Sequence, residues 1–125
     1  MPRVYAMCDL LVNASYIEGL PMAILEAMAA RVAVIATNVG AVAKVITGGK
    51  SGICMEPGDP ERLAKAIIEL IEDKEKRKQF ADAAYQDVCE RFSDGRMARR
   101  YREIYEGILL EKWKPFYECP FFSAK

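Results

Sequence analysis

Residues 15–30 read SYIEGLPMAILEAMAA, and this stretch decides the fold expected for the chain. Two glutamates, Glu18 and Glu26, stand on either side of a Gly-Leu-Pro turn that leads into an apolar run. Gly19 permits a positive φ or a close backbone approach, and the φ of Pro21 is preset for the first turn of a helix. The stretch therefore predicts a helix that begins near Pro21.

The start of this helix is a candidate anion site. Its free N–H groups and the positive end of its dipole favour a phosphate. Carboxylates on either side suit a nucleotide sugar, with Glu26 accepting hydrogen bonds from a ribose diol and Glu18 from hydroxyls of the sugar. The diphosphate would lie between them. The alternative is that Glu18 caps a turn and Glu26 is a solvated helix residue.

The spacing of the two glutamates does not identify such a site, because two other pairs in the chain share it. These pairs are Glu61 with Glu69 and Glu103 with Glu111. Both lie inside long charged helical patterns, whereas Glu18 precedes a helix start and Glu26 lies within that helix. The context of the first pair supports the nucleotide-sugar interpretation.

Three short apolar runs rich in Val, Ile or Leu predict buried strands near residues 9–14, 32–36 and 52–56. Helical patterns separate these runs, which predicts a parallel sheet with right-handed crossovers. Three such strands make about half of a Rossmann-like, doubly wound α/β sheet. The length of 125 residues is that of one domain. We expect one domain with an α/β core over 1–58, helices over 59–112 and an aromatic tail over 113–125.

The second half of the chain is expected to be helical. Asp59 and Pro60 form an N-cap and first-turn pair for a helix that ends near Asp73. A second helix is expected over residues 74–91, and Ser93 is expected to begin a third. Each helix carries an apolar stripe that we interpret as core. The stripes are Leu63, Ile67, Leu70 and Ile71; Phe80, Ala84 and Val88; and Met97, Tyr101, Ile104 and Ile108.

Two features of the expected fold need a covering partner. The first strand would have an unpaired edge, which predicts a homo-oligomer, a swapped assembly or a missing partner polypeptide. Residues 113–122, WKPFYECPFF, hold five aromatic residues and two prolines and are too irregular for a continuing helix. We expect this tail to pack on protein, with a membrane-interface anchor at Trp113 as the alternative.

The stretch 15–30 resembles the donor-sugar motif of retaining glycosyltransferases with the GT-B fold, the group 1 or family 4 enzymes. Four further segments resemble the same family, so the resemblance covers about residues 4–110. They are MCDLLVNAS, VAVIATNVGAVAKVI, SGICMEPGD and RFSDGRMARRYREIYEGIL. The resemblance implies that the chain is part of the C-terminal, donor-binding domain of a hexosyltransferase. Such an enzyme moves a sugar from a nucleoside diphosphate to an acceptor sugar or lipid-linked acceptor, with retention.

The resemblance also implies roles for individual residues. Glu18 would be the catalytic residue, positioning the sugar near its reacting carbon without acting as a nucleophile, while the leaving phosphate assists attack from the same face. No cofactor or metal is implied, because the helix dipole and basic side chains replace a cation at the diphosphate. The donor-binding residues implied are Ser15, Gly19, Leu20, Pro21, Met22, Glu26 and Gly40.

Some positions depart from the family pattern. Arg31 stands where a glycine usually ends the motif helix, Ala33 replaces a common proline, Ala41 a second glycine and Lys44 a frequent acid. The sequence also holds no counterpart of the family's upstream diphosphate-binding residues or acceptor domain, so we expect it to be inactive alone. The alternative is a non-catalytic subunit or interaction module with a glycosyltransferase-like half-fold. A natural split subunit, a truncated piece and a relic remain open, as do the base, the sugar, the acceptor and the oligomeric state.

Composition limits the other functions. The chain has 18 basic and 18 acidic residues, which argues against a nucleic-acid partner. It has no histidine and no Asp-x-Asp pair, which excludes a Ser-His-Asp triad and histidine metal sites within this chain. Four cysteines without Cys-x-x-Cys spacing favour reduced thiols in a cytoplasmic protein. Arginines around residues 91–102 form either a solvated face or a peripheral contact with an anionic membrane.

Overall fold

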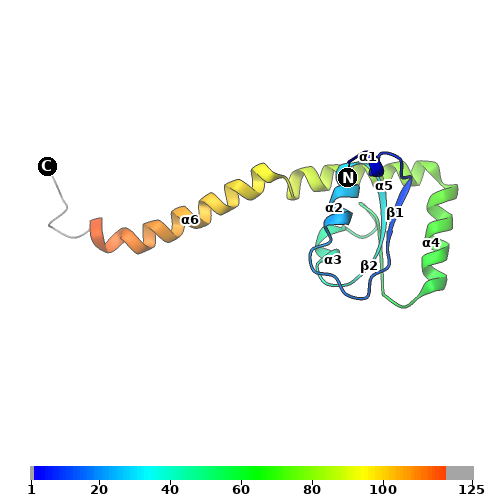
Figure 1. Ribbon diagram of the computed structural model, residues 1–125, viewed down its shortest axis with the longest axis horizontal. Helices are drawn as coiled ribbons and strands as arrows, with labels where there is room; N and C mark the ends of the chain where they lie inside the picture. The colour runs from blue at the N-terminus through cyan, green and yellow to red at the C-terminus, as the bar shows by residue number, and fades with distance from the viewer. Residues whose placement is uncertain (1, 118–125) are drawn as a thin grey trace. The chain divides into compact units, whose positions relative to one another are not determined.

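The computed structural model describes residues 2–117, with side chains described over residues 3–110. The chain divides into two compact units, residues 1–92 and residues 93–125. The first unit is an α/β layer structure, and the second contains one long helix (Figure 1).

A three-stranded parallel sheet forms the centre of the first unit. Its strands are β1 (Leu10–Asn13), β2 (Ala33–Thr37) and β3 (Ile53–Met55), paired in the order β1-β2-β3. The prediction of three strands in a parallel sheet is confirmed. The prediction that all three are buried holds only for β2, because β1 has no fully buried residue and β3 has one, Met55. Within the described residues β1 has a neighbouring strand on one side only. Its pairing with another chain stays a prediction.

Helices cover both faces of this sheet. α1 (Pro2–Tyr5) precedes β1, α2 (Met22–Ala29) and α3 (Val42–Val45) connect successive strands, and α4 (Pro60–Glu72) follows β3. Successive residues of β2 belong to opposite faces. Its residues 34 and 36 pack in a core cluster with α2, and its residues 33 and 35 pack in a second cluster with α4. Because both faces are covered, every residue of β2 is buried, as in the centre of a doubly wound sheet.

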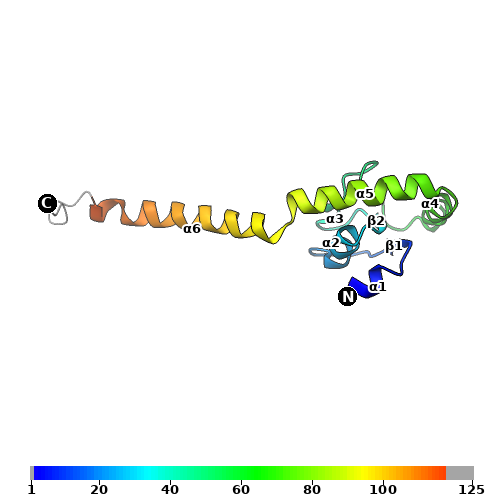
Figure 2. The same cartoon turned by 90° about the horizontal axis from the view of Figure 1, so that it is seen from above.

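α5 (Lys74–Arg91) crosses the sheet at the amino ends of all three strands (Figures 1 and 2). A polar side chain of α5 contacts the segment that leads into each strand. The pairs are Arg77 with Asp9, Asp82 with Arg31, and Asp87 with Thr47 and Ser51. This helix therefore closes the amino end of the sheet, and the loops at the carboxyl ends are the ones that can form a site.

Arg31, which stands where the family usually has a glycine, lies just after the end of α2. This residue has a φ of 58°, the left-handed conformation in which a glycine is usual. The N–H groups of Arg31 and Val32 donate to the carbonyls of Met28 and Ala27, which is the Schellman pattern. The guanidinium of Arg31 lies 2.5 Å from Asp82, and 4.2 Å from the ring centre of Tyr85. The exposed ion pair, worth about 0–1 kcal/mol, and the cation–π contact, worth about 0.5–1 kcal/mol, oppose the roughly 1–2 kcal/mol cost of the left-handed backbone.

The predicted helix limits and most of the predicted stripes are confirmed in the first unit. Asp59 caps α4 by accepting a 2.9 Å hydrogen bond from the backbone N–H of Arg62. Leu70, Phe80, Ala84 and Val88 are buried, and Leu63 and Ile67 are partly buried. The assignment of Ile71 to the core is wrong, because it is 56% exposed. One residue after Leu70 the helix has turned by about 100°, which carries the next side chain off the buried face.

The second unit consists of α6 (Asp94–Tyr117) within the described residues. The carbonyl of Ser93 accepts from the N–H groups of Arg96 and Met97, so the predicted start is confirmed. The predicted break at residue 113 is wrong, because the helix continues to Tyr117. The rest of the expected tail, residues 118–122, lies outside the described residues.

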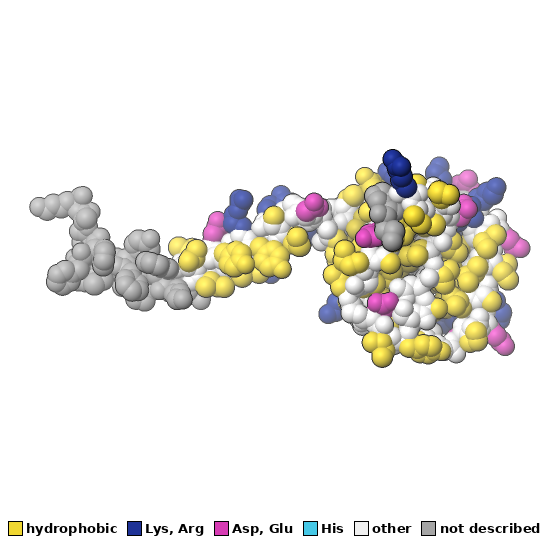
Figure 3. Space-filling model, in the orientation of Figure 1, with side chains coloured by type: hydrophobic (Ala, Val, Ile, Leu, Met, Phe, Trp, Pro, Cys, Tyr) yellow, Lys and Arg dark blue, Asp and Glu magenta, His cyan; other side chains and the backbone are white. Residues whose placement is uncertain are grey.

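The interpretation of the α6 stripe as core is also wrong. Met97, Tyr101, Ile104 and Ile108 are between 46% and 58% exposed. Figure 3 shows hydrophobic side chains gathered along this helix. The 3.6-residue period predicts which face of a helix is apolar but not what covers it. Separately, none of the helices within residues 2–117 combines the length and the apolar character needed to cross a bilayer.

Candidate functional site

Glu18 lies in the loop after β1, and two neighbours hold one of its oxygens. The side-chain amide of Asn13 donates to Oε1 of Glu18 at 3.2 Å, and the hydroxyl of Ser15 donates to the same oxygen at 2.8 Å. Oε2 receives no hydrogen bond from the described residues. The carboxylate is partly buried, so its orientation is set while one oxygen stays available to a ligand.

Thr37 joins this loop to the end of β2. Its hydroxyl donates to the backbone carbonyl of Ser15 and lies 3.5 Å from the carbonyl of Asn13. The hydroxyl of Thr37 is therefore a bridge between two strand ends. Asn13 and Thr37 were not among the site residues predicted from the sequence. A detectable sign was the polar residue at the last position of two neighbouring strands, β1 and β2, which parallel pairing brings to the same edge.

Gly40 packs directly against the backbone of the Glu18 loop. Its φ is 55°, and a Cβ added there would lie 1.8 Å from the carbonyl oxygen of Glu18. The N–H of Ala41 donates to the carbonyl of Gly19 at 3.2 Å. The structure thus brings the predicted residues Gly40, Gly19 and Glu18 together, and only a glycine allows the two loops to approach this closely.

The turn 19–22 leads into α2 as predicted. Leu20 and Met22 are exposed and Pro21 is buried, with its carbonyl accepting from the N–H of Ile24 at 3.0 Å. No side chain caps this helix start, and its first turn has no acid. By contrast, aspartates cap the starts of α4 and α5. The start of α2 is consequently the one of these three that lacks an internal acceptor.

Glu26 is exposed one turn further along α2, where it meets Tyr5 of α1. Burial raises the pKa of Tyr5, and the hydrogen bond to the Glu26 carboxylate and its negative charge raise it further. The protonated phenol is thus favoured in the folded chain, so its contribution to stability is present below about pH 10 and is lost as the pH rises through the raised pKa. A carboxylate has about four acceptor positions, so Glu26 keeps capacity for a ligand.

This contact can be tested by titration. Replacing Glu26 by glutamine removes the charge, so the pKa of Tyr5 is expected to fall toward its ordinary value. Titration of the Tyr5 ring by carbon NMR measures the change. Glu18→Gln is the control and should leave the Tyr5 titration unaltered. An unchanged Tyr5 titration in Glu26→Gln would show that the two side chains do not interact.

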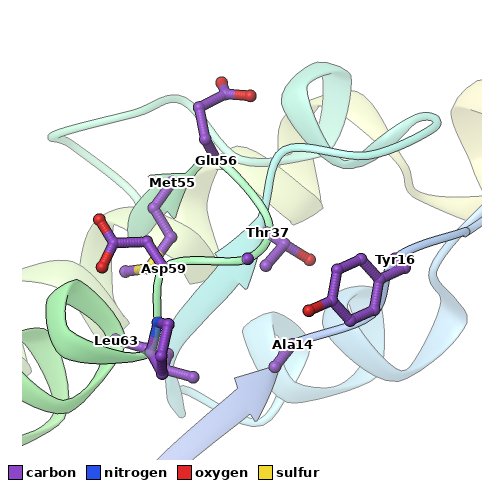
Figure 4. Close-up of a pocket in the computed structure, with 9 residues that line it drawn as sticks. Ala14, Tyr16, Thr37, Met55, Glu56, Asp59 and Leu63 are labelled. Atoms are coloured by element: carbon purple, nitrogen blue, oxygen red, sulfur yellow. The ribbon is translucent and has the colours of Figure 1, made fainter.

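A separate hollow of about 150 Å³ opens at the same edge of the sheet (Figure 4). Its walls come from the ends of all three strands and from the start of α4, and none of the eight predicted site residues lines it. Figure 4 shows the hydroxyl of Tyr16 directed toward the hollow and the carboxylates of Glu56 and Asp59 directed away from it. The interior is therefore mainly apolar. In the described part of the chain no three His, Cys, Asp or Glu side chains gather as a metal site.

Known proteins share both the sequence and the geometry of this unit. A sequence model described as glycosyl transferases group 1 matches residues 1–87. The N-acetyl-alpha-D-glucosaminyl L-malate synthase of Bacillus anthracis is 35% identical over 107 residues, which are 86% of this chain. These residues are 28% of that protein, so the chain spans less than a third of its length.

Two solved structures show the same arrangement. The Anabaena protein Alr3699/HepE, solved in complex with UDP, matches with a TM-score of 0.82 at 28% identity, over 86% of this chain and 30% of that chain. The C-terminal domain of LpcC, a glycosyl transferase group 1 family protein from Francisella tularensis, matches with a TM-score of 0.68 at 34% identity. This second match covers 73% of this chain and 47% of that chain.

Proposed function

Because the chain belongs to the glycosyl transferases group 1 family, we propose that its site binds the nucleoside-diphosphate sugar donor of a glycosyltransferase. The proposal rests on two features at the carboxyl end of the sheet that remain available to a ligand, a hydrogen-bond acceptor and a set of backbone donors. Glu18 offers a free Oε2, and the start of α2 has no internal cap. The proposal is supported by the similar fold of the Anabaena protein, which has been solved with UDP and with UDP-glucose.

In this proposal the diphosphate lies at the start of α2, where N–H groups and the helix dipole favour negative charge. Glu26 accepts hydrogen bonds from the ribose, and Glu18 accepts them from hydroxyls of the transferred sugar. Ser15, Gly19 and Gly40 shape the loop that carries Glu18, and residues 20–22 form the turn beside the phosphates. Charge stabilisation at the leaving diphosphate then needs no metal ion.

The proposed reaction is transfer of the sugar to an acceptor with retention of configuration. Glu18 orients the sugar and does not attack it, so its contribution is positioning and charge stabilisation. The acceptor and the remaining diphosphate contacts would come from protein outside this chain, since the chain spans 30% of the Anabaena protein. We expect the 125 residues alone to bind donor weakly and not to turn over.

The proposal is tested by titrating the chain with UDP, GDP and ADP, each to millimolar concentration, while the backbone amides are observed by NMR. The amides of residues 19–26 are expected to shift with at least one nucleotide. Glu26→Ala should weaken that binding by about tenfold, because two hydrogen bonds to the ribose are lost. Glu72→Ala, which removes an exposed glutamate at the far end of α4, is the control and should bind as the parent chain does.

Two results would count against the proposal. Shifts that persist unchanged in Glu26→Ala would show that Glu26 does not bind the nucleotide. The absence of any shift would favour the alternative of a non-catalytic interaction module.

A further inference from the structure

We propose that Asn13 is a positioning residue, which holds Oε1 of Glu18 so that Oε2 faces the hydroxyls of the donor sugar. This inference rests on the proposed function, because it assigns Glu18 to the sugar. Asn13 itself does not touch the substrate and acts through Glu18.

Both polar atoms of the Asn13 side-chain amide form hydrogen bonds. Its Oδ1 accepts from the backbone N–H of Ser15 at 3.2 Å, and its Nδ2 donates to Oε1 of Glu18 at 3.2 Å. A backbone N–H can only donate, so the oxygen of the amide must face Ser15 and the NH₂ must face Glu18. The two contacts together therefore determine which way the amide is turned.

The second donor to Glu18 acts on the same oxygen. Ser15 donates its hydroxyl to Oε1 at 2.8 Å, so both protein donors lie on one side of the carboxylate. A carboxylate held in this way cannot rotate without breaking both hydrogen bonds. Its other oxygen is left as an acceptor for sugar hydroxyls, which are donors of the matching kind.

Asn13 is also well placed to be rigid. It is the last residue of β1 and pairs with Ala36 of the buried central strand β2. The next residue of β2, Thr37, donates to the carbonyl of Ser15. The Glu18 loop is thus hydrogen-bonded to the sheet through the side chains of Asn13 and Thr37, which lie in regular strands. Such support keeps the geometry of a site fixed.

Asn13→Asp separates the two functions of the amide. The aspartate has the same shape and still accepts from the N–H of Ser15, so the turn is kept. The donor to Glu18 is replaced by a second carboxylate, which repels it and turns Oε2 out of position. The matched control is Asn38→Asp, because Asn38 lies directly after β2 and likewise donates its Nδ2 to a carboxylate, Oε1 of Glu56, at 3.1 Å.

The measurement is the affinity of each variant for UDP-glucose and for UDP, with Glu18→Gln as the reference. Both Asn13→Asp and Glu18→Gln are expected to weaken UDP-glucose binding by about tenfold and to change UDP binding by less than about twofold. Asn38→Asp should change neither. A defect in the turn alone would alter both ligands, so the difference between them separates positioning from structure.

A ligand-free measurement checks the contact itself. The side-chain NH₂ resonances of Asn13 should shift in Glu18→Gln, and those of Asn38 should not. Unchanged side-chain NH₂ resonances of Asn13 in Glu18→Gln would overturn the inference, regardless of the ligand affinities.

The measurements distinguish failure of the role proposed for Glu18 from failure of the role proposed for Asn13. If Glu18→Gln leaves UDP-glucose binding unchanged, or if the parent chain binds neither ligand, the assigned role of Glu18 fails and this inference fails with it. If Glu18→Gln weakens UDP-glucose binding but Asn13→Asp does not, only the inference about Asn13 is overturned.

Discussion

Replacing Gly40 by alanine is expected to destabilise the chain by about 2–4 kcal/mol and to abolish nucleotide-induced shifts in residues 19–26. A Cβ at this position would lie 1.8 Å from the carbonyl oxygen of Glu18 and 2.8 Å from its carbonyl carbon, both of which are backbone atoms. Neither can move aside as a side chain would. The two loops must separate, which also breaks the hydrogen bond from the N–H of Ala41 to the carbonyl of Gly19.

The matched controls are Gly49→Ala and Gly58→Ala. Their φ values of 76° and 87° are also positive, but an added Cβ at either site has nothing within 4 Å. Each should cost about 1–2 kcal/mol from backbone strain alone. Urea unfolding followed by circular dichroism gives the three free energies of unfolding. A loss in Gly40→Ala no larger than in the controls would show that the loops do not meet at this point.

Replacing Asp87 by alanine is expected to lower the free energy of unfolding by about 2–3 kcal/mol. Its Oδ2 accepts from the hydroxyl of Thr47 at 2.9 Å, from the hydroxyl of Ser51 at 3.3 Å and from the guanidinium of Arg91 at 2.9 Å. Ser51 is 1% exposed, so its hydroxyl would lose a partner that water cannot readily replace. α5 would then lose its main polar contact with the segment that enters β3.

Asp82→Ala is the control on the same helix. Asp82 contacts the segment that enters β2 through Arg31, but the side chains of this pair are 42% and 57% exposed. An exposed ion pair contributes about 0–1 kcal/mol, so this variant should lose much less stability. Urea unfolding of both variants at low and high salt measures the difference. Equal losses would show that burial of the Asp87 contacts does not matter.

Much of the local structure was predictable because it depends on neighbouring residues. The apolar runs near 9–14, 32–36 and 52–56 became the three strands, since each is too short for a helix and is bounded by turns. Asp59 and Pro60 started α4 because the capping hydrogen bond spans only three residues. The resemblance of the chain to the group 1 glycosyltransferases with the GT-B fold is confirmed by the family match and by the Anabaena structure.

The candidate site was predictable only in part. Glu18, Ser15, Gly19 and Gly40 do come together at the carboxyl edge of the sheet, and Glu26 lies one turn along α2, where it interacts with Tyr5. Their ligand roles stay proposals. Asn13 and Thr37 were missed because their position at strand ends shows only that they lie at this edge, and their hydrogen bonds to the Glu18 loop depend on the tertiary structure. The prediction that the apolar stripe of α6 is core was wrong for a related reason. The 3.6-residue period shows which face of a helix is apolar but not what packs against that face.

In the first unit the sequence by itself determined approximately where the strands and the longer helices begin and end, because hydrophobic period, caps and turn residues act over a few positions of the chain. Only the tertiary structure decided which polar residues matter. Asp82 and Asp87 look alike along α5, and Gly40, Gly49 and Gly58 look alike in their loops, yet their surroundings differ. That difference arises from segments distant in sequence, which parallel pairing and the crossing of α5 bring together.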